Sequence, residues 1–99
     1  MDEKALLIEL QERGLFVDPQ LPIQVTYKEK SIGLFFADLV VDQKVIIELK
    51  AAKTIIPEFE AQILNYLHAS KFEVGLLINF GNTKLEYRRY SRFSKKQFD

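Results

Sequence analysis

The stretch "FFADLVVDQKVIIELKAAK", residues 35–53, contains two apolar runs on either side of a short polar segment. Its alternation and its β-branched side chains predict two strands, at about residues 32–41 and 45–51, with a turn over residues 42–44. A connection this short joins antiparallel neighbours. The stretch therefore predicts a hairpin in the middle of a sheet.

Three charged residues, Asp38, Glu48 and Lys50, lie inside the apolar runs of this hairpin. If Gln43 is its centre, Asp38 faces Glu48 with Cβ atoms ~5 Å apart, and Lys50 is their neighbour. A shift of one residue would send the two acids to opposite faces of the sheet. Opposed carboxylates suit a divalent cation such as Mg²⁺, beside which Lys50 would act on the attacking water or the phosphate. The alternative is a structural triad in which Lys50 satisfies both acids.

The other elements follow from periodicity and from the positions of glycine and proline. We expect a helix at about residues 3–13, ended by Gly14, and a second helix that begins at Pro57. Pro19 and Pro22 indicate an extended connection. Further strands are expected at about residues 23–28, 72–80 and 84–90. The order αβββαββ, with a crossover helix before a strand that returns in parallel, predicts an α/β fold.

Composition narrows the class of protein. The 99 residues are enough for one domain, residues 1–99, and the chain has no cysteine for disulfides or thiolate metal sites. Fourteen basic and fourteen acidic residues give zero net charge, unlike a protein that coats DNA. The N-terminus is amphipathic and acidic rather than signal-like, and no apolar run approaches the ~20 residues of a membrane span. We expect a cytoplasmic protein without a membrane partner.

The C-terminal residues 84–99 carry six basic side chains against two acidic ones, interleaved with aromatic residues. This mixture suits phosphates and base stacking, and a solvated edge strand with a frayed basic tail is the alternative. The only histidine, His68, is expected at the surface or at a helix end. The candidate nucleic-acid-binding residues are Lys53, Lys84, Arg88, Arg89 and Arg92.

Asp38 followed by Glu48-Leu49-Lys50 resembles the D-x(n)-E-x-K signature of the PD-(D/E)XK nuclease superfamily, with Ala37 in place of the proline. The resemblance implies a restriction-endonuclease-like αβββαβ core, in which a central mixed sheet is flanked by helices. It also implies a Mg²⁺ or Mn²⁺ ion held by Asp38, Glu48 and the Leu49 carbonyl, with Lys50 as a catalytic residue.

Gln62-x-x-x-Tyr66 on the second expected helix resembles the pattern that follows E-x-K in RecB-like nucleases. The two side chains lie one turn apart and project to one side of the helix. The resemblance implies that Gln62 and Tyr66 belong to the catalytic site, whereas the alternative is ordinary helix packing with a polar edge.

Most of the chain, from about Ala5 to Arg89, resembles the GxxExxY family of small prokaryotic proteins, which is assigned to the same superfamily. The resemblance rests on "ELQERGL", "YKEKSIGLFFADLVVDQKVIIELKA", "EAQILNYLHAS" and "VGLLINFGNTKLEYRR". The name-giving segment would precede Ala5, and its glutamate would fall before Met1. Glu3 and Glu9 do not fit that motif and are expected to be solvated helix residues.

The functional hypothesis is a Mg²⁺- or Mn²⁺-dependent nuclease that hydrolyses phosphodiester bonds in DNA, with RNA as the second choice of substrate. Asp38, Glu48 and Lys50 form its core, and the basic C-terminal stretch steadies the backbone. The alternative is a catalytically inactive module of the same fold that binds nucleic acid or a protein partner. Self-association into a homodimer through apolar surface beside the first helix is a further alternative.

Overall fold

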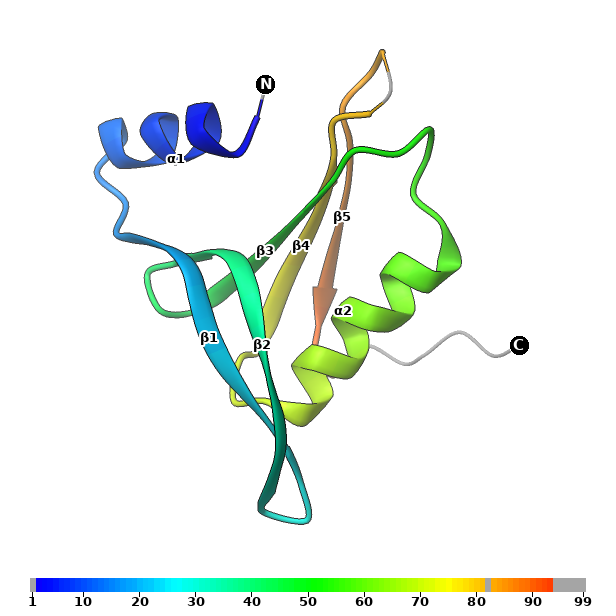
Figure 1. The fold of residues 1–99 in the computed structure, drawn as a ribbon. Helices are drawn as coiled ribbons and strands as arrows, with labels where there is room; N and C mark the ends of the chain where they lie inside the picture. Colours follow the sequence, from blue (N-terminus) through cyan, green and yellow to red (C-terminus); the bar gives the residue numbers. More distant parts are fainter. Residues whose placement is uncertain (1, 82, 94–99) are drawn as a thin grey trace.

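The computed structural model describes residues 2–81 and 83–93 and contains two helices and five strands in that part of the chain (Figure 1). In chain order the elements are α1 (Glu3–Glu12), β1 (Val17–Tyr27), β2 (Lys30–Val41), β3 (Val45–Lys50), α2 (Pro57–Ala69), β4 (Val74–Asn79) and β5 (Glu86–Ser91). The strands form one sheet in the order β1-β2-β3-β4-β5. Only the β3–β4 pair is parallel, since the other three neighbouring pairs are antiparallel. The predicted α/β fold with a central mixed sheet is confirmed.

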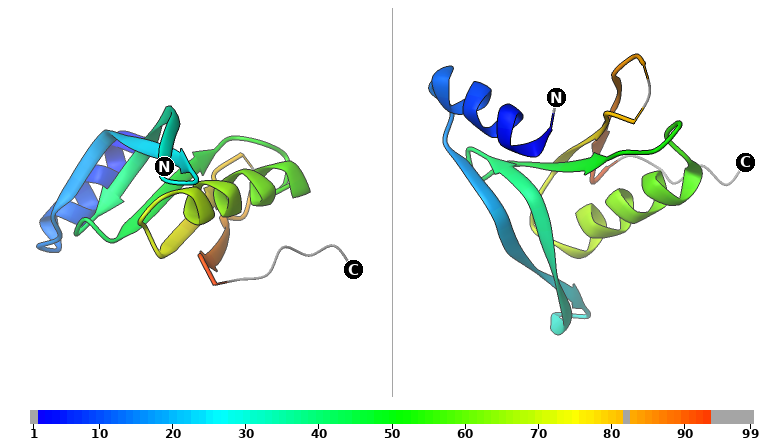
Figure 2. Two further views of the ribbon diagram at one scale, coloured as in Figure 1. Left: turned by 90° about the horizontal axis from the view of Figure 1, so that it is seen from below. Right: turned by 45° about the horizontal axis from the view of Figure 1, so that its top comes forward.

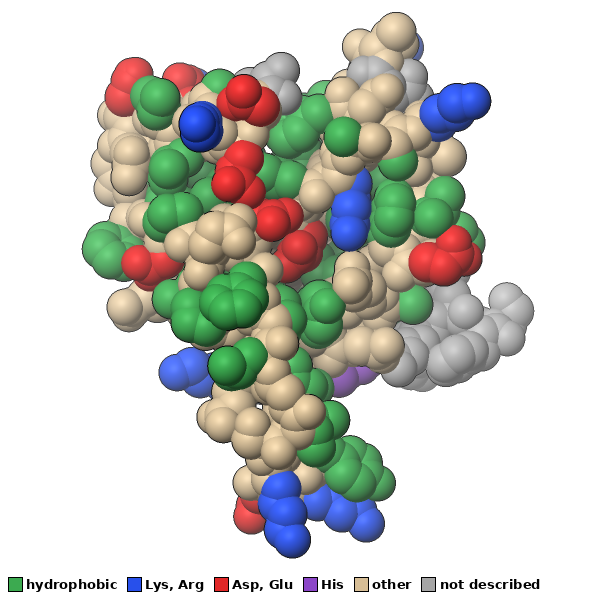
Figure 3. Space-filling model, viewed as in Figure 1, with side chains coloured by type: hydrophobic (Ala, Val, Ile, Leu, Met, Phe, Trp, Pro, Cys, Tyr) green, Lys and Arg blue, Asp and Glu red, His purple; other side chains and the backbone are tan. Residues whose placement is uncertain are grey.

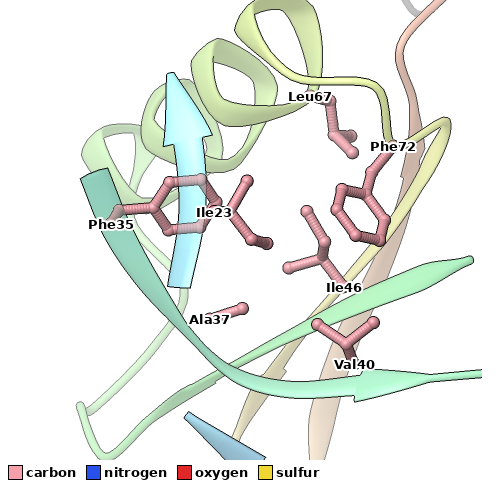
Figure 4. Packing of buried hydrophobic residues seen from close by; sticks show 7 residues of the cluster. All are labelled: Ile23, Phe35, Ala37, Val40, Ile46, Leu67 and Phe72. Carbon is pink, nitrogen blue, oxygen red and sulfur yellow. The ribbon is translucent and has the colours of Figure 1, made fainter. Parts of the chain in front are cut away.

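The two helices cover opposite faces of the sheet, as Figure 2 shows. On the α2 side, Leu67 packs with Ile23, Phe35, Ala37, Val40, Ile46 and Phe72, whose side chains converge beneath the helix (Figure 4). On the α1 side, Val17, Leu39 and Ile47 are buried against Leu6, Leu7 and Leu10 of α1. β3 therefore has buried side chains on both faces, which explains its nearly unbroken apolar sequence.

Both helices begin where the sequence predicts, and α1 ends shortly before the predicted Gly14. The Asp2 carboxylate caps α1 by accepting a hydrogen bond from Ala5 N at 2.9 Å, and Gly14 follows the helix with φ 83°. Pro57 occupies the first turn of α2, where the missing N–H costs nothing. α2 is also tied to β5, because the Tyr90 hydroxyl donates a hydrogen bond to Glu60.

The first strand differs from the prediction. β1 begins at Val17 rather than near Ile23, so Pro19 and Pro22 lie within a strand and not in a connection before it. The reason is topological, since β1 is the edge of the sheet and a proline without an N–H is tolerated on an edge strand. Pairing with β2 extends to Tyr27, which makes a long two-stranded hairpin.

The burial of side chains along β2 does not follow strict alternation and changes near Asp38. Phe35 and Ala37 are buried before Asp38, whereas Val40, of the opposite parity, joins the same core cluster after it. Leu34 and Phe36 are exposed. After Asp38 both faces of β2 are covered, because Leu39 belongs to the cluster on the α1 side and Val40 to the cluster on the α2 side.

A tight contact holds the loop after β3 against the turn after β4. A Cβ atom added at Gly81 would lie 2.2 Å from Ala52 O and 2.3 Å from Ala52 N, both of them backbone atoms. We expect Gly81→Ala to destabilise the fold by about 2 kcal/mol or more, because the backbone must move. Urea denaturation checks this, with Gly33→Ala as the matched control, since an added Cβ at Gly33 meets no atom of the described residues within 4 Å. Equal midpoints for the two variants would contradict the contact.

Candidate active site

The β2–β3 hairpin has the register that the sequence predicts. Leu39 pairs with Ile47, Val40 with Ile46 and Val41 with Val45, which centres the hairpin on Gln43. The backbone pairing ends at Leu39 and Ile47. One step further, the Asp38 carboxylate accepts a hydrogen bond from Leu49 N at 2.8 Å, so a side chain continues the contact where the strands separate.

Glu48 lies beside Asp38 and is almost fully buried, with 8% of its surface exposed. Its Oε1 atom has no hydrogen-bond partner in the part of the chain that the structure describes, which is unusual because buried polar atoms are nearly always paired. Burial raises the pKa of Glu48 to about 8, and the negative charge of Asp38 adds to this effect while Lys50 opposes it. The protein thus holds an acid that is protonated at neutral pH beside a second carboxyl group.

Lys50 is close enough to influence Glu48 electrostatically, but it makes no ion pair with Asp38 or Glu48 within the described residues. Its Nζ donates a hydrogen bond to Gln62 Oε1 at 3.4 Å and lies 4.8 Å from the centre of the Phe59 ring. The structure therefore does not support the structural triad, in which the lysine would satisfy both acids. The ammonium group is held by a neutral amide and an aromatic face.

Gln62 and Tyr66 project from the same side of α2, as their spacing predicts. Gln62 Nε2 donates a hydrogen bond to Tyr66 OH at 2.9 Å, which extends the chain of contacts that begins at Lys50. The Tyr66 ring stacks on Phe35 of β2 with centroids 3.6 Å apart and an interplanar angle of 7°. Sequence reasoning identified Gln62 and Tyr66 but missed Phe35 and Phe59, which looked like ordinary core residues.

A buried asparagine anchors the far end of β3, and sequence reasoning missed it too. Asn79 is fully buried and pairs with Lys50 across the parallel β3–β4 ladder. Its amide accepts from Ala52 N and donates to Ala52 O, both at 2.9 Å, and it also donates to Glu86 Oε1 at 2.9 Å. This last bond is the main cause that lowers the pKa of Glu86. The only sequence signal was a polar residue at the end of an apolar run.

The predicted nucleic-acid-binding residues lie in several different elements of the fold. Lys53 and Lys84 are exposed in loops. Arg88 and Arg89 are neighbours on β5, so their side chains leave opposite faces of that edge strand. Arg92 instead lines a cavity of about 850 Å³ together with Lys71, Ser70 and Thr26. Lys95 and Lys96 lie outside the described residues.

The remaining titratable candidates lie apart from the acid pair. Glu9 pairs with Arg13 at 3.0 Å, while Glu3 Oε1 accepts a hydrogen bond from Gln20 Nε2 at 3.5 Å. His68 is exposed on α2, as expected. Among residues 2–81 and 83–93, no three His, Cys, Asp or Glu side chains gather in a way that could hold a metal ion. A metal here would need backbone or water oxygens besides Asp38 and Glu48.

Even so, the residues present fit a hard divalent cation. The buried Glu48 Oε1 has no hydrogen-bond partner among the described residues and is an oxygen of the kind that could coordinate such a cation, and the Asp38 carboxylate lies next to it. In an extended strand the N–H and C=O of one residue point to the same edge, so the Leu49 carbonyl lies on the edge of β3 that faces Asp38. Two carboxylates, a carbonyl and waters form a ligand set typical of Mg²⁺ or Mn²⁺.

Seen from outside, acidic side chains gather on one face of the molecule between α1 and α2, with a basic side chain beside them (Figure 3). This face also carries exposed apolar side chains of the β1–β2 hairpin.

Neither helix in the described part of the chain has the length and apolarity to span a membrane.

Comparison with known proteins assigns the chain to a superfamily. The PD-(D/E)XK nuclease superfamily matches residues 1–90, and the chain belongs to that superfamily. The order of its helices and strands fits this assignment, and Asp38 lies on β2 while Glu48 and Lys50 lie on β3. The comparison does not distinguish the GxxExxY family within the superfamily. No curated protein matches the chain.

Two solved structures share the fold. The crystal structure of SSO0001 superposes with a TM-score of 0.67 at 13% identity, covering 90% of this chain and 47% of that one. An alkaline exonuclease (LHK-Exo) from Laribacter hongkongensis superposes with a TM-score of 0.54 at 12% identity, covering 89% of this chain and 53% of that one. The chain thus spans about half the length of each structure. At such low identity the likeness concerns the fold.

Proposed function

We propose that this domain is a divalent-metal-dependent nuclease that hydrolyses phosphodiester bonds in DNA. The observation that carries the proposal is the acid pair, in which a buried glutamate with an unpartnered oxygen lies against Asp38 in apolar surroundings. A purely structural role does not account for that oxygen, because an apolar side chain would be more stable there. Membership of the nuclease superfamily supports the same conclusion.

Asp38 and Glu48, with the Leu49 carbonyl, would hold a Mg²⁺ or Mn²⁺ ion. The bound cation would polarise a phosphoryl oxygen and make a hydroxide-like nucleophile available near neutral pH. The hydrogen bond from Leu49 N fixes one oxygen of Asp38 and leaves the other for coordination. The proton of Glu48 must leave before this carboxylate can act as a ligand, so metal affinity rises with pH.

Lys50 would place its positive charge on the scissile phosphate or orient the attacking water. It is suited to this role because Lys50 forms no ion pair with a carboxylate among residues 2–81 and 83–93, while Phe59 and Gln62 restrict where Nζ can lie. Gln62 is in turn fixed by Tyr66, and the Tyr66 ring is fixed by stacking on Phe35. These contacts pre-organise the ammonium group, which reduces the reorganisation needed during reaction.

Cleavage assays test the proposal. Single-stranded DNA, double-stranded DNA and single-stranded RNA are incubated with Mg²⁺ or Mn²⁺ and either wild type or Asp38→Asn. We expect metal-dependent cleavage of DNA that falls by at least ~100-fold in the variant, as when several kcal/mol of transition-state stabilisation are lost. Asp18→Asn on β1 is the matched control and should cleave normally, and circular dichroism verifies that each variant folds.

Equal cleavage by wild type and Asp38→Asn would contradict the proposed site. Absence of metal-dependent cleavage with every substrate, by protein that is folded, would instead favour an inactive module that binds nucleic acid or a protein partner. Preferential cleavage of RNA would correct the substrate and keep the site.

A further inference from the structure

The β1–β2 hairpin projects beyond α2 as an arm, residues 22–36 (Figure 1). One side of β2 in this arm is buried through Phe35, whereas the other side presents large apolar residues to solvent. Ile32, Leu34 and Phe36 expose 66%, 63% and 58% of their surfaces. They occupy alternate positions of one strand and so form a single stripe, which we call the arm stripe. Such a contiguous exposed apolar surface usually marks an interaction site.

The arm stripe leads away from the candidate active site. Phe36 lies two positions before Asp38 on β2, so strand alternation places both side chains on the same side of the strand, ~7 Å apart along it. Figure 3 shows apolar side chains on the visible face of the arm, below the gathered acidic side chains. A substrate bound at Asp38 and Glu48 can therefore continue onto the arm stripe without leaving the surface.

The far end of the arm is basic. Lys28 and Lys30 flank Glu29 in the tight turn, and both lysines are exposed. Lys28 Nζ lies 5.5 Å from the centre of the Tyr27 ring, which is 63% exposed. From Asp38 to Lys30 the strand extends about 27 Å at ~3.4 Å per residue. The arm thus combines an apolar face of some length with cations and an aromatic ring at its tip.

We propose that the arm stripe binds a single-stranded nucleic acid which continues from the active site, with bases against Phe36, Leu34 and Ile32 and phosphates near Lys28 and Lys30. The proposal rests on the nuclease function proposed above. Unpaired bases present flat apolar faces next to a charged backbone, which matches an apolar stripe that ends in cations. A duplex hides its base faces and presents phosphates, so it would leave the three apolar residues without partners. For this reason we infer a single strand at this surface.

Fluorescence anisotropy with a labelled 20-nucleotide single strand and the corresponding duplex tests the proposal. EDTA is present so that no cleavage occurs. Leu34→Ser/Phe36→Ser should weaken single-strand binding by about 10-fold or more, since each base stacked on a side chain contributes substantially. Lys28→Gln/Lys30→Gln should make the slope of log affinity against log salt shallower by about 1.4, or ~0.7 per phosphate contact. Ile8→Ser and Lys4→Gln, exposed on α1, are matched controls that should bind as wild type does.

Three results would overturn the proposal. The first is single-strand affinity in the arm variants equal to that of the controls. The second is tighter binding of the duplex, with equal losses on both substrates. The third is a wild-type dimer in light scattering that Leu34→Ser/Phe36→Ser converts to monomer, which would mean that a second copy covers the arm stripe.

The outcome separates this proposal from that of the nuclease. If the arm variants lose binding but wild type shows no metal-dependent cleavage, the proposed single-strand binding by the arm stripe stands and the proposed nuclease activity is rejected. If cleavage depends on Asp38 but the arm variants bind single strands as wild type does, the proposed nuclease activity stands and the proposed binding role of the arm stripe is rejected.

Discussion

Replacing Glu48 with Gln is expected to make the metal-free protein more stable at neutral and alkaline pH. The pKa of Glu48 is raised from its ordinary value of about 4.5 to about 8 in the folded protein. A raised pKa means that the folded state favours the protonated acid. The contribution of Glu48 to the free energy of unfolding is therefore fully present below pH 4.5. It declines as the pH rises above 4.5 and is lost once the pH has risen through 8. At 1.36 kcal/mol per pKa unit, the loss is about 3 kcal/mol by pH 7.

Gln has nearly the shape of protonated Glu and can donate to Asp38, so Glu48→Gln should remove this loss. We expect the two proteins to have similar free energies of unfolding at pH 4.5 and to differ by about 3 kcal/mol at pH 7. Urea denaturation in EDTA across this pH range measures the difference. Glu58→Gln, an exposed position on α2, is the control and should follow wild type at every pH. A constant difference between wild type and Glu48→Gln would contradict the raised pKa.

Manganese provides a second comparison on the same variant. If Asp38 and Glu48 bind the ion, Mn²⁺ at 100 times its Kd should stabilise wild type by about 2.7 kcal/mol at pH 7.5. Glu48→Gln and Asp38→Asn should gain much less, because each removes a carboxylate ligand. Equal stabilisation of all three proteins would place the bound Mn²⁺ elsewhere.

Replacing Lys50 with Ala is expected to abolish nearly all cleavage while the fold is kept. The Lys50 side chain is only partly buried and makes one long hydrogen bond and one cation–π contact, so its removal should cost no more than about 1 kcal/mol of stability. Loss of a positive charge aimed at the reacting phosphate costs about 100-fold or more in rate. Single-turnover cleavage with Mn²⁺ measures this loss separately from binding.

Two variants sharpen the Lys50 experiment. Lys50→Arg keeps the charge but changes its geometry, so partial activity would indicate an electrostatic role, while none would indicate a positional or proton-transfer role. Lys71→Ala removes an exposed lysine that lies outside the candidate site and should cleave normally. Wild-type rates for Lys50→Ala would contradict the proposed mechanism.

Much of the fold could be predicted from local signals. Asp2 and Gly14 bound α1, Pro57 begins α2, and residues 42–44 form the turn that sets the hairpin register. β1 differs most from the prediction, because Pro19 and Pro22 indicate a connection in the sequence but lie within this strand. Proline is excluded from the interior of a sheet but not from its edge, and only the order of strands shows which strand is the edge.

The site was predictable in part. The parity of Asp38, Glu48 and Lys50 and the spacing of Gln62 and Tyr66 are local properties, and the structure brings all five residues into one region. The contributions of Phe35, Phe59 and Asn79 were not predictable, because each acts across elements that are distant in sequence. The basic residues 84–92 looked like one patch in the sequence but are divided between faces and loops.

By itself, the sequence determined the element order, the hairpin register and the presence of two acids and a lysine in an apolar hairpin. These features depend on turns, periodicity and the two-residue repeat of a strand, all of which act over a few residues. The tertiary structure alone decided that Glu48 is buried with an unpartnered oxygen and that Lys50 contacts Phe59 and Gln62. It also decided that the apolar residues of the arm stripe are exposed to solvent. Burial and pKa depend on which elements pack together, and that packing is a property of the whole chain.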